Sequence, residues 1–156
     1  MAPTLLARGW RVIGTAREAA DVPGVEMIIW PGQDIPLTGV THILSSIGPN
    51  AKGDPVLAHL WDEIATVAPD LAWVGYLSTT AVYGDRRGDW VDETTPIAPT
   101  SERGTWRAEA EAQWQQVPDL PLHIFRLAGI YGPGRGPFAK LMAGTARRIV
   151  KPGQVS

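Results

Sequence analysis

Cysteine is missing from this chain of 156 residues, and so are a strong net charge and any long apolar run. Without cysteine the protein has no disulfide, no thiolate nucleophile and no cysteine-ligated zinc site, a composition that fits a cytoplasmic protein. The formal net charge of −2 offers no basic field to nucleic acid or to anionic lipid. No apolar run approaches the roughly 18 residues of a membrane span, and the N-terminal Leu5-Leu6-Ala7 is too short for the core of a signal peptide.

Short apolar segments rich in β-formers alternate with segments of helical periodicity. The pattern predicts strands over 10–16, 25–30, 41–47, 71–77 and 122–128, with a last short strand over 147–150. It predicts the end of a helix over 1–9, closed by Gly9, and helices over 55–68, 101–116 and 138–146. Asp54 is placed to cap the second of these. Apolar strands that alternate with helices are typical of an α/β fold with a doubly wound, mostly parallel sheet covered on both faces.

The central strand is followed by hydroxyl residues. The stretch from Leu71 to Asp85 reads LAWVGYLSTTAVYGD, with Ser78, Thr79 and Thr80 after the apolar run. The carboxyl ends of strands are where open α/β sheets bind their ligands. Serine and threonine also cap the turn after a strand by accepting a backbone N–H bond. Local chemistry alone leaves both interpretations open.

Two motifs resemble the extended short-chain dehydrogenase/reductase family, the NAD(P)-dependent epimerases, dehydratases and reductases. The first is STTAVYG at 78–84, followed by DETTP at 92–96 and PTS at 99–101. The second is FRLAGIYGPG at 125–134, which is similar to the family's R-x-x-N-x-Y-G-P-G segment. The resemblance covers 71–134 and implies a Rossmann-type fold, a dinucleotide cofactor, and hydride transfer on a small carbonyl or sugar derivative.

The Gly-x-Gly-x-x-Gly turn, which lets the backbone approach the pyrophosphate of a dinucleotide, is absent from the sequence. Residues 1–10 resemble the end of the helix that follows this turn, and 151–156 the approach to the family's substrate region. We therefore expect an internal fragment, a single partial Rossmann-like domain over 1–156, that lacks the first strand and most of the substrate-binding region. We expect weak cofactor binding, and either direct pairing of strands 10–16 and 41–47 or exposed edges that favour a homodimer.

The resemblance assigns three residues to the reaction centre. Thr79 stands where the family has the serine or threonine that orients the reacting oxygen. Alignment on Pro99-Thr100-Ser101 places Arg103 at the tyrosine and Arg107 at the lysine of the family's Tyr-x-x-x-Lys pair. At pH 7 well under about one arginine in 10⁵ is deprotonated, so Arg103 is no acid or base. Arg107 keeps the lysine's positive charge for ribose or phosphate, and the alternative for both arginines is a solvated helix face with Glu102, Glu109 and Glu111 as ion partners.

The remaining assignments concern the cofactor. Thr15 and Arg17 end the strand at 10–16, and because an arginine there accommodates a 2′-phosphate, we expect NADP rather than NAD. The alternative for Arg17 is an ordinary surface arginine. Ser45, Ser46 and Ile47 are assigned to the adenine and ribose side, and Leu77 and Leu127 to the nicotinamide.

Two further features bear on function. Gly129 replaces an asparagine that contacts substrate in many family members, which weakens a sugar-nucleotide epimerase assignment. His42, His59 and His123 have no metal-ligand spacing, so we expect no metal site. Because the Tyr-Lys pair is replaced, a non-catalytic nucleotide-sensing or protein-interaction module of the same fold is the alternative to an oxidoreductase.

Overall fold

The computed structural model describes residues 1–147, and the chain divides into two compact units between Thr38 and Gly39. The strand expected over 147–150 lies outside the described residues except for Arg147. Within residues 1–147 every strand pairing is parallel, and the strands form two sheets, β1-β2 and β3-β4-β5. The α/β fold expected from the alternating pattern is therefore confirmed, and the strands expected over 10–16 and 41–47 belong to different sheets.

The first unit contains one short helix and two strands. Helix α1 spans Ala2–Leu6, and the chain leaves it through Gly9, whose φ of 80° is in the left-handed region. The amides of Gly9 and Trp10 donate to the carbonyls of Leu6 and Leu5, which is the glycine-closed helix end that the sequence predicts. Strand β1 (Ile13–Ala16) pairs with β2 (Glu26–Ile29), with Ile13 opposite Glu26. The first strand is thus three residues shorter than the pattern predicts at its start.

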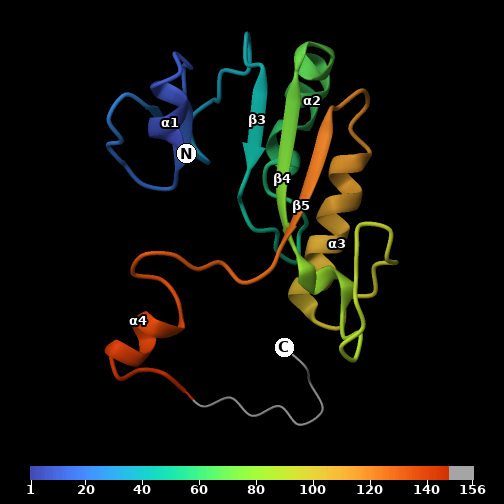
Figure 1. Ribbon diagram of the computed structural model, residues 1–156. Coiled ribbons are helices and arrows are strands. Elements are labelled where there is room, and N and C mark those ends of the chain that lie inside the picture. Colours follow the sequence, from blue (N-terminus) through green and yellow to red (C-terminus); the bar gives the residue numbers. More distant parts are fainter. Residues whose placement is uncertain (148–156) are drawn as a thin grey trace. The chain divides into compact units, whose positions relative to one another are not determined.

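The second unit is built on three parallel strands. These are β3 (His42–Ser45), β4 (Trp73–Thr79) and β5 (Leu122–Leu127), with β4 in the centre (Figure 1). The connecting helices are α2 (Leu57–Val67), the short η1 (Ala68–Asp70) and η2 (Thr80–Tyr83), and α3 (Glu102–Gln115). Helix α4 (Pro137–Met142) follows β5. Strand β4 ends two residues later than predicted, so Ser78 and Thr79 are part of the strand.

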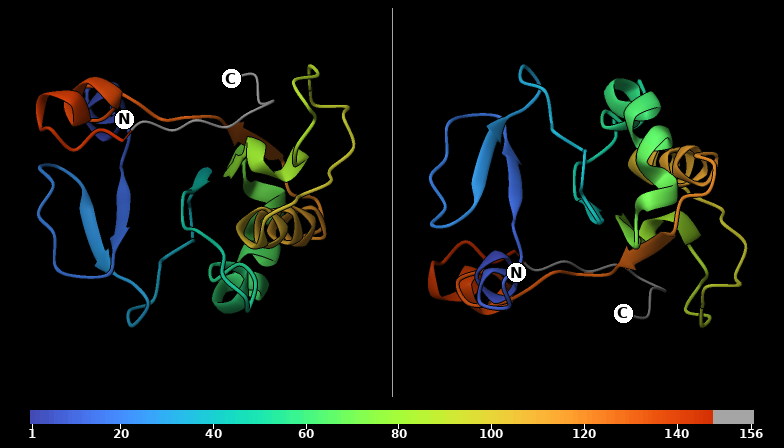
Figure 2. Two further views of the ribbon diagram at one scale, coloured as in Figure 1. Left: turned by 90° about the horizontal axis from the view of Figure 1, so that it is seen from below. Right: turned by 90° about the horizontal axis from the view of Figure 1, so that it is seen from above.

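The helices α2 and α3 lie on the same side of this sheet (Figure 2). That side carries Val74 and Tyr76 of β4, both with 0% exposure, and Trp114 of α3 packs its ring 5.8 Å from the Tyr76 ring. Alternate residues of a strand point to opposite faces, so Ser78 shares this face. Burial of each large apolar side chain stabilises the folded state by about 1.5–3 kcal/mol. Because these buried side chains lie between the sheet and α3, the core of the unit lies there.

Both long helices begin at side chains that accept hydrogen bonds from the first turn. The Asp54 carboxylate accepts from the amides of Val56 and Leu57 at 2.9 and 3.1 Å, and the Ser101 hydroxyl accepts from the amide of Gly104 at 3.2 Å. These bonds satisfy amide groups that have no partner within the helix. The expected cap at Asp54 is confirmed, and Asp54 is itself buried.

The opposite face of the sheet is shaped by Gly75. A Cβ atom at this position would lie 2.1 Å from the Trp73 ring, so only glycine allows that ring to lie across the strand. The Trp73 ring stacks on His123 of β5, with centroids 5.9 Å apart. Leu77, Thr79 and Leu127 project from this same face, because Thr79 and Leu127 are register partners.

Candidate functional site

Thr79 is the last residue of β4, and its hydroxyl has a local partner. Oγ1 accepts a hydrogen bond from the amide of Ala81 at 3.2 Å and thereby caps η2. The capping role expected from local chemistry is therefore present in the structure. Thr79 is half-buried at the carboxyl end of the central strand, and its contact with a reacting oxygen stays a prediction.

Arg107 lies on α3 and reaches the carboxyl end of β4. Its Nη1 donates to the Leu77 carbonyl at 2.6 Å and to the Tyr76 hydroxyl at 3.2 Å, and its guanidinium lies 5.7 Å from the Tyr76 ring centroid. Burial raises the pKa of Tyr76 to about 12, so this phenol stays neutral at physiological pH. The interpretation of Arg107 as part of a solvated helix face is wrong, because the side chain is half-buried and held by β4.

Arg103, one helical turn before Arg107, is exposed. Within the described residues its side chain makes no hydrogen bond or ion pair with another side chain. The solvated-face interpretation therefore describes Arg103. Its assignment to the reaction centre stays a prediction.

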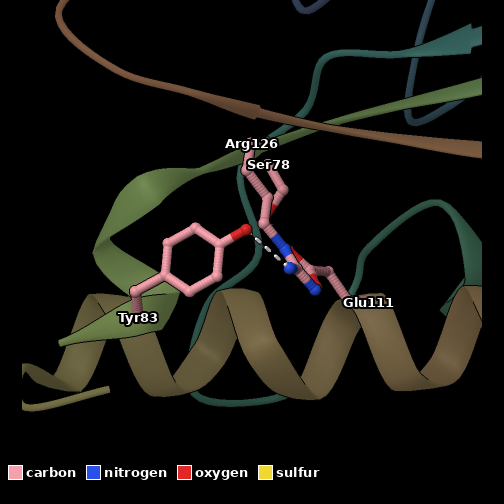
Figure 3. Close-up of polar contacts among 4 residues, drawn as sticks. All are labelled: Ser78, Tyr83, Glu111 and Arg126. Atoms are coloured by element: carbon pink, nitrogen blue, oxygen red, sulfur yellow. Dashed lines mark hydrogen bonds and ion pairs between the residues drawn. The ribbon is translucent and has the colours of Figure 1, made fainter. Parts of the chain in front are cut away.

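A buried polar network links β4, β5 and α3 (Figure 3). Glu111 of α3 is 1% exposed, and its carboxylate accepts hydrogen bonds from Nε and Nη2 of Arg126 at 3.2 and 2.8 Å. The Ser78 hydroxyl donates to the other oxygen of the same carboxylate. The alternative interpretation that places Glu111 on a solvated helix face is wrong for this residue, because β5 places a counterion directly opposite it.

Tyr83 of η2 completes this network. Its hydroxyl accepts a hydrogen bond from Nη1 of Arg126 at 2.9 Å, and the guanidinium lies 4.9 Å from its ring centroid. The Glu111 carboxylate, through its hydrogen bonds, holds the pKa of Arg126 above the ordinary value. The charge of Arg126 is therefore compensated inside the fold, and the network ties the ends of β4 and β5 to the middle of α3.

The residues predicted to bind the cofactor fall in both units. Thr15 and Arg17 lie at the end of β1 in the first unit, and both are exposed. Ser45 ends β3 in the second unit and is 4% exposed, while Ser46 is exposed and Ile47 is half-buried. Leu77 and Leu127 are half-buried on the sheet face that carries Thr79. The structure therefore brings Leu77, Thr79 and Leu127 onto one face, and it places Ser45 on the other, opposite Tyr76.

An open groove of about 770 Å³ runs beside β5, between this strand, the end of α3 and the loop after η2. Among the residues predicted for the site, Leu127 lines it, and Thr79 and Arg107 do not. The groove is therefore separate from Arg107 and from its partners Tyr76 and Leu77.

The loop after η2 holds its acidic residues in local turns. The Asp92 carboxylate accepts hydrogen bonds from the hydroxyl groups of Thr94 and Thr95, at 2.7 and 3.1 Å, and these bonds lower the pKa of Asp92. This arrangement fits a residue that shapes the loop. In residues 1–147 no group of three or more histidine, aspartate or glutamate side chains is arranged to hold a metal ion. None of the described helices is long and apolar enough to cross a membrane.

Sequence reasoning missed Tyr76, Glu111 and Arg126 as partners of the site. A signal was available on α3, where positions 104, 107, 111 and 114 recur at intervals of three and four and so share one face. Gly104 and Trp114 on this face are buried, which implies that Arg107 and Glu111 also point toward the sheet. The partners of these two residues lie on β4 and β5, and only the folded chain brings them together.

No family model matches the chain. It is 30% identical to the protein YeeZ of Escherichia coli over 88% of its own length and 56% of that protein. Among solved structures, a conserved protein of unknown function from Silicibacter pomeroyi is 59% identical, with a TM-score of 0.89 over 97% of this chain and 55% of that one. The chain spans about half the length of the curated relatives it matches.

The UDP-glucuronic acid 4-epimerase of Bacillus cereus, solved in complex with NAD, superposes with a TM-score of 0.71 at 17% identity, over 90% of this chain and 56% of that one. A dTDP-glucose 4,6-dehydratase in complex with NAD is also among the structural neighbours. At such identities the likeness concerns the fold alone. The fold is of the Rossmann type.

Proposed function

We propose that the chain is an NAD(P)-binding domain of the extended short-chain dehydrogenase/reductase family, of the epimerase/dehydratase type, with hydride transfer on a small carbonyl or sugar derivative as its chemistry. The observation that carries the proposal is the anchoring of Arg107 to the Leu77 carbonyl near the carboxyl end of β4, the strand that ends at Thr79, where open α/β sheets bind ligands. The Rossmann-type fold, the neighbours solved with NAD and the two sequence motifs support it.

In this proposal Thr79 orients the reacting oxygen and Arg107 contributes a fixed positive charge to the ribose or phosphate of the cofactor. Arg103 stands where the family has its proton-transferring tyrosine, and an arginine cannot release a proton near neutral pH. Gly129, in place of an asparagine, removes a contact to substrate. The chain's own residues therefore supply binding and orientation more readily than proton transfer.

The second candidate is a nucleotide-sensing or protein-interaction module without turnover. The engagement of the two phenols nearest the site favours it: the hydroxyls of Tyr76 and Tyr83 are both held by arginines. Neither phenol replaces the missing tyrosine of the family pair. Both candidates predict that the chain binds a nucleotide or carries a surface derived from a nucleotide-binding site. They differ in whether the chain turns a substrate over.

For the cofactor we propose NADP, with NAD as the weaker ligand. Arg17 directly follows β1 and is exposed, and Thr15 lies on that strand; an arginine at this place accommodates a 2′-phosphate. Ser45, Ser46 and Ile47 are proposed for the adenine and ribose side, and Leu77 and Leu127 for the nicotinamide. Binding is expected to be weak, because the sequence has no Gly-x-Gly-x-x-Gly turn for the pyrophosphate.

The test is a titration of this chain with NADPH and, in parallel, with NADH, up to millimolar concentrations. Seven tryptophans allow energy transfer to a bound nicotinamide to be followed by fluorescence. Saturable binding that prefers NADPH, and that loses the preference in Arg17→Gln, supports the proposal. A folded chain that binds neither nucleotide contradicts it. Loss of NADPH absorbance with any of a panel of carbonyl compounds separates the enzyme from the module.

A further inference from the structure

Arg107 uses only part of its hydrogen-bonding capacity. A guanidinium has five N–H groups, and both partners of Arg107, the Tyr76 hydroxyl and the Leu77 carbonyl, are held by Nη1. In the part of the chain that the structure describes, Nε and Nη2 make no hydrogen bond. One whole edge of the guanidinium therefore remains available, and Nε and Nη2 present two parallel N–H groups along it.

The charge of Arg107 is also uncompensated. Its two partners are neutral, because the second is a backbone carbonyl and burial keeps the Tyr76 phenol protonated. Among residues 1–147 no carboxylate lies within ion-pair distance of its guanidinium, whereas Arg126 on the same sheet face has Glu111. A half-buried cation without a counterion favours an anionic ligand, since desolvation weakens its interaction with water.

The available edge lies between the ends of two strands. Nη2 is 3.5 Å from the place where a Cβ of Gly48 would stand, so the guanidinium borders the loop that follows β3. Ser45, the last residue of β3, is the register partner of Tyr76 and is 4% exposed. Its hydroxyl has no hydrogen-bond partner among the described residues. A second polar group without a partner therefore lies on the same face of the sheet, one strand away.

We propose that Arg107 is a bidentate receptor for an oxyanion at the carboxyl ends of β3 and β4, and that Tyr76 is the residue that positions it. The ligand group is one that presents two oxygens side by side, such as a phosphate or a carboxylate. The inference deepens the proposed function. It rests on that function for one point, the identity of the ligand as a dinucleotide. The arginine at this position is not equivalent to the lysine of the family pair, because a lysine is a point charge and cannot match two oxygens at once.

The experiment measures ligand binding and the state of the arginine together. The intact chain is titrated with NADPH, NADH, inorganic pyrophosphate and succinate, and ¹H–¹⁵N spectra follow the Nε–H resonance of Arg107, assigned by its loss in Arg107→Gln. The variants are Arg107→Gln, Arg107→Lys, Tyr76→Phe and the double variant Tyr76→Phe with Arg107→Gln. Arg8→Gln is the matched control, since it removes the same charge from an exposed position.

We expect the ligand to shift the Nε–H resonance, and the dissociation constant to rise roughly tenfold or more in both Arg107→Gln and Arg107→Lys, as loss of charge-assisted hydrogen bonds implies. Tyr76→Phe removes the hydrogen bond that the Arg107 guanidinium donates to the phenol, and it should weaken binding roughly two- to tenfold. It should have no further effect once Arg107 is replaced, because a positioning residue acts only through the residue it holds. Arg8→Gln should bind as the wild type does.

The outcomes separate this inference from the proposed function. Equal NADPH binding by wild type and Arg107→Gln overturns the inference and the cofactor contact proposed for Arg107, and it leaves the proposed NAD(P)-binding domain standing. Equal binding by Arg107→Lys overturns the bidentate geometry. Arg107-dependent binding of pyrophosphate or succinate without any binding of nucleotide supports the oxyanion receptor and contradicts the proposed function. A folded wild type that binds none of the four ligands overturns both.

Discussion

Arg107 and Arg126 face the same side of the three-stranded sheet, yet they have opposite environments. Arg126 is bound by the buried carboxylate of Glu111 and by the Tyr83 hydroxyl. Arg107 is bound by a phenol and a backbone carbonyl, both neutral. Because the counterion decides what an arginine contributes, the comparison assigns Arg126 to the fold and supports the proposal that Arg107 serves a ligand.

The largest effect is expected from removal of the Arg126 counterion. Glu111→Ala leaves a buried cation and the Ser78 hydroxyl without partners, so the free energy of unfolding should fall by about 3 kcal/mol. Urea unfolding followed by circular dichroism measures it. The matched control is Glu109→Ala, which removes an exposed carboxylate of the same helix and should cost under about 1 kcal/mol. Equal losses in the two variants would contradict a structural role for the network.

Removal of the second partner of Arg126 should cost less. Tyr83→Phe deletes the hydroxyl that accepts from Nη1 and keeps the ring beneath the guanidinium, so the free energy of unfolding should fall by about 1 kcal/mol. The same urea titration applies. A neutral or stabilising result would show that this hydroxyl contributes nothing to the compensation of Arg126.

The pH dependence of stability tests the environment of Tyr76, the neutral partner of Arg107. Burial raises the pKa of Tyr76 to about 12 from 10.0, so the folded state disfavours ionisation of this phenol. Its contribution to stability is fully present below the unfolded pKa of 10.0 and is lost as pH rises through about 12. Unfolding midpoints of the wild type should therefore fall between about pH 10 and pH 12 more steeply than those of Tyr76→Phe.

An effect much smaller than that of Glu111→Ala is expected at Arg107 itself. Arg107→Gln removes a cation that has no carboxylate partner in the described part of the chain and loses only its hydrogen bonds to the Leu77 carbonyl and the Tyr76 hydroxyl, so the free energy of unfolding should fall by about 1 kcal/mol. Urea unfolding of this variant, beside the ligand titrations, makes the contrast with Glu111→Ala direct. A loss as large as that of Glu111→Ala would place Arg107 in the structural framework and end the distinction between the two arginines.

Several features of the molecule follow from the sequence alone. The alternation of apolar and helical segments determined the order of strands and helices and their parallel class, because strand and helix periodicities differ and parallel strands are apolar on both faces. The helix end at Gly9 and the cap at Asp54 were predictable for a local reason: each depends on residues within a few positions of one another.

Other features were decided only by the tertiary structure. Arg107 and Glu111 share one face of α3 with Trp114, and nothing in their neighbours along the chain tells which of the two charges meets a counterion. Tyr76 lies 31 residues from Arg107, and Arg126 lies 15 from Glu111; the sheet fixes which of these meet. The division of the strands into two sheets depends likewise on long-range pairing. The sequence therefore determined what each segment would form, and tertiary packing decided which charges would be compensated and which would remain available for a ligand.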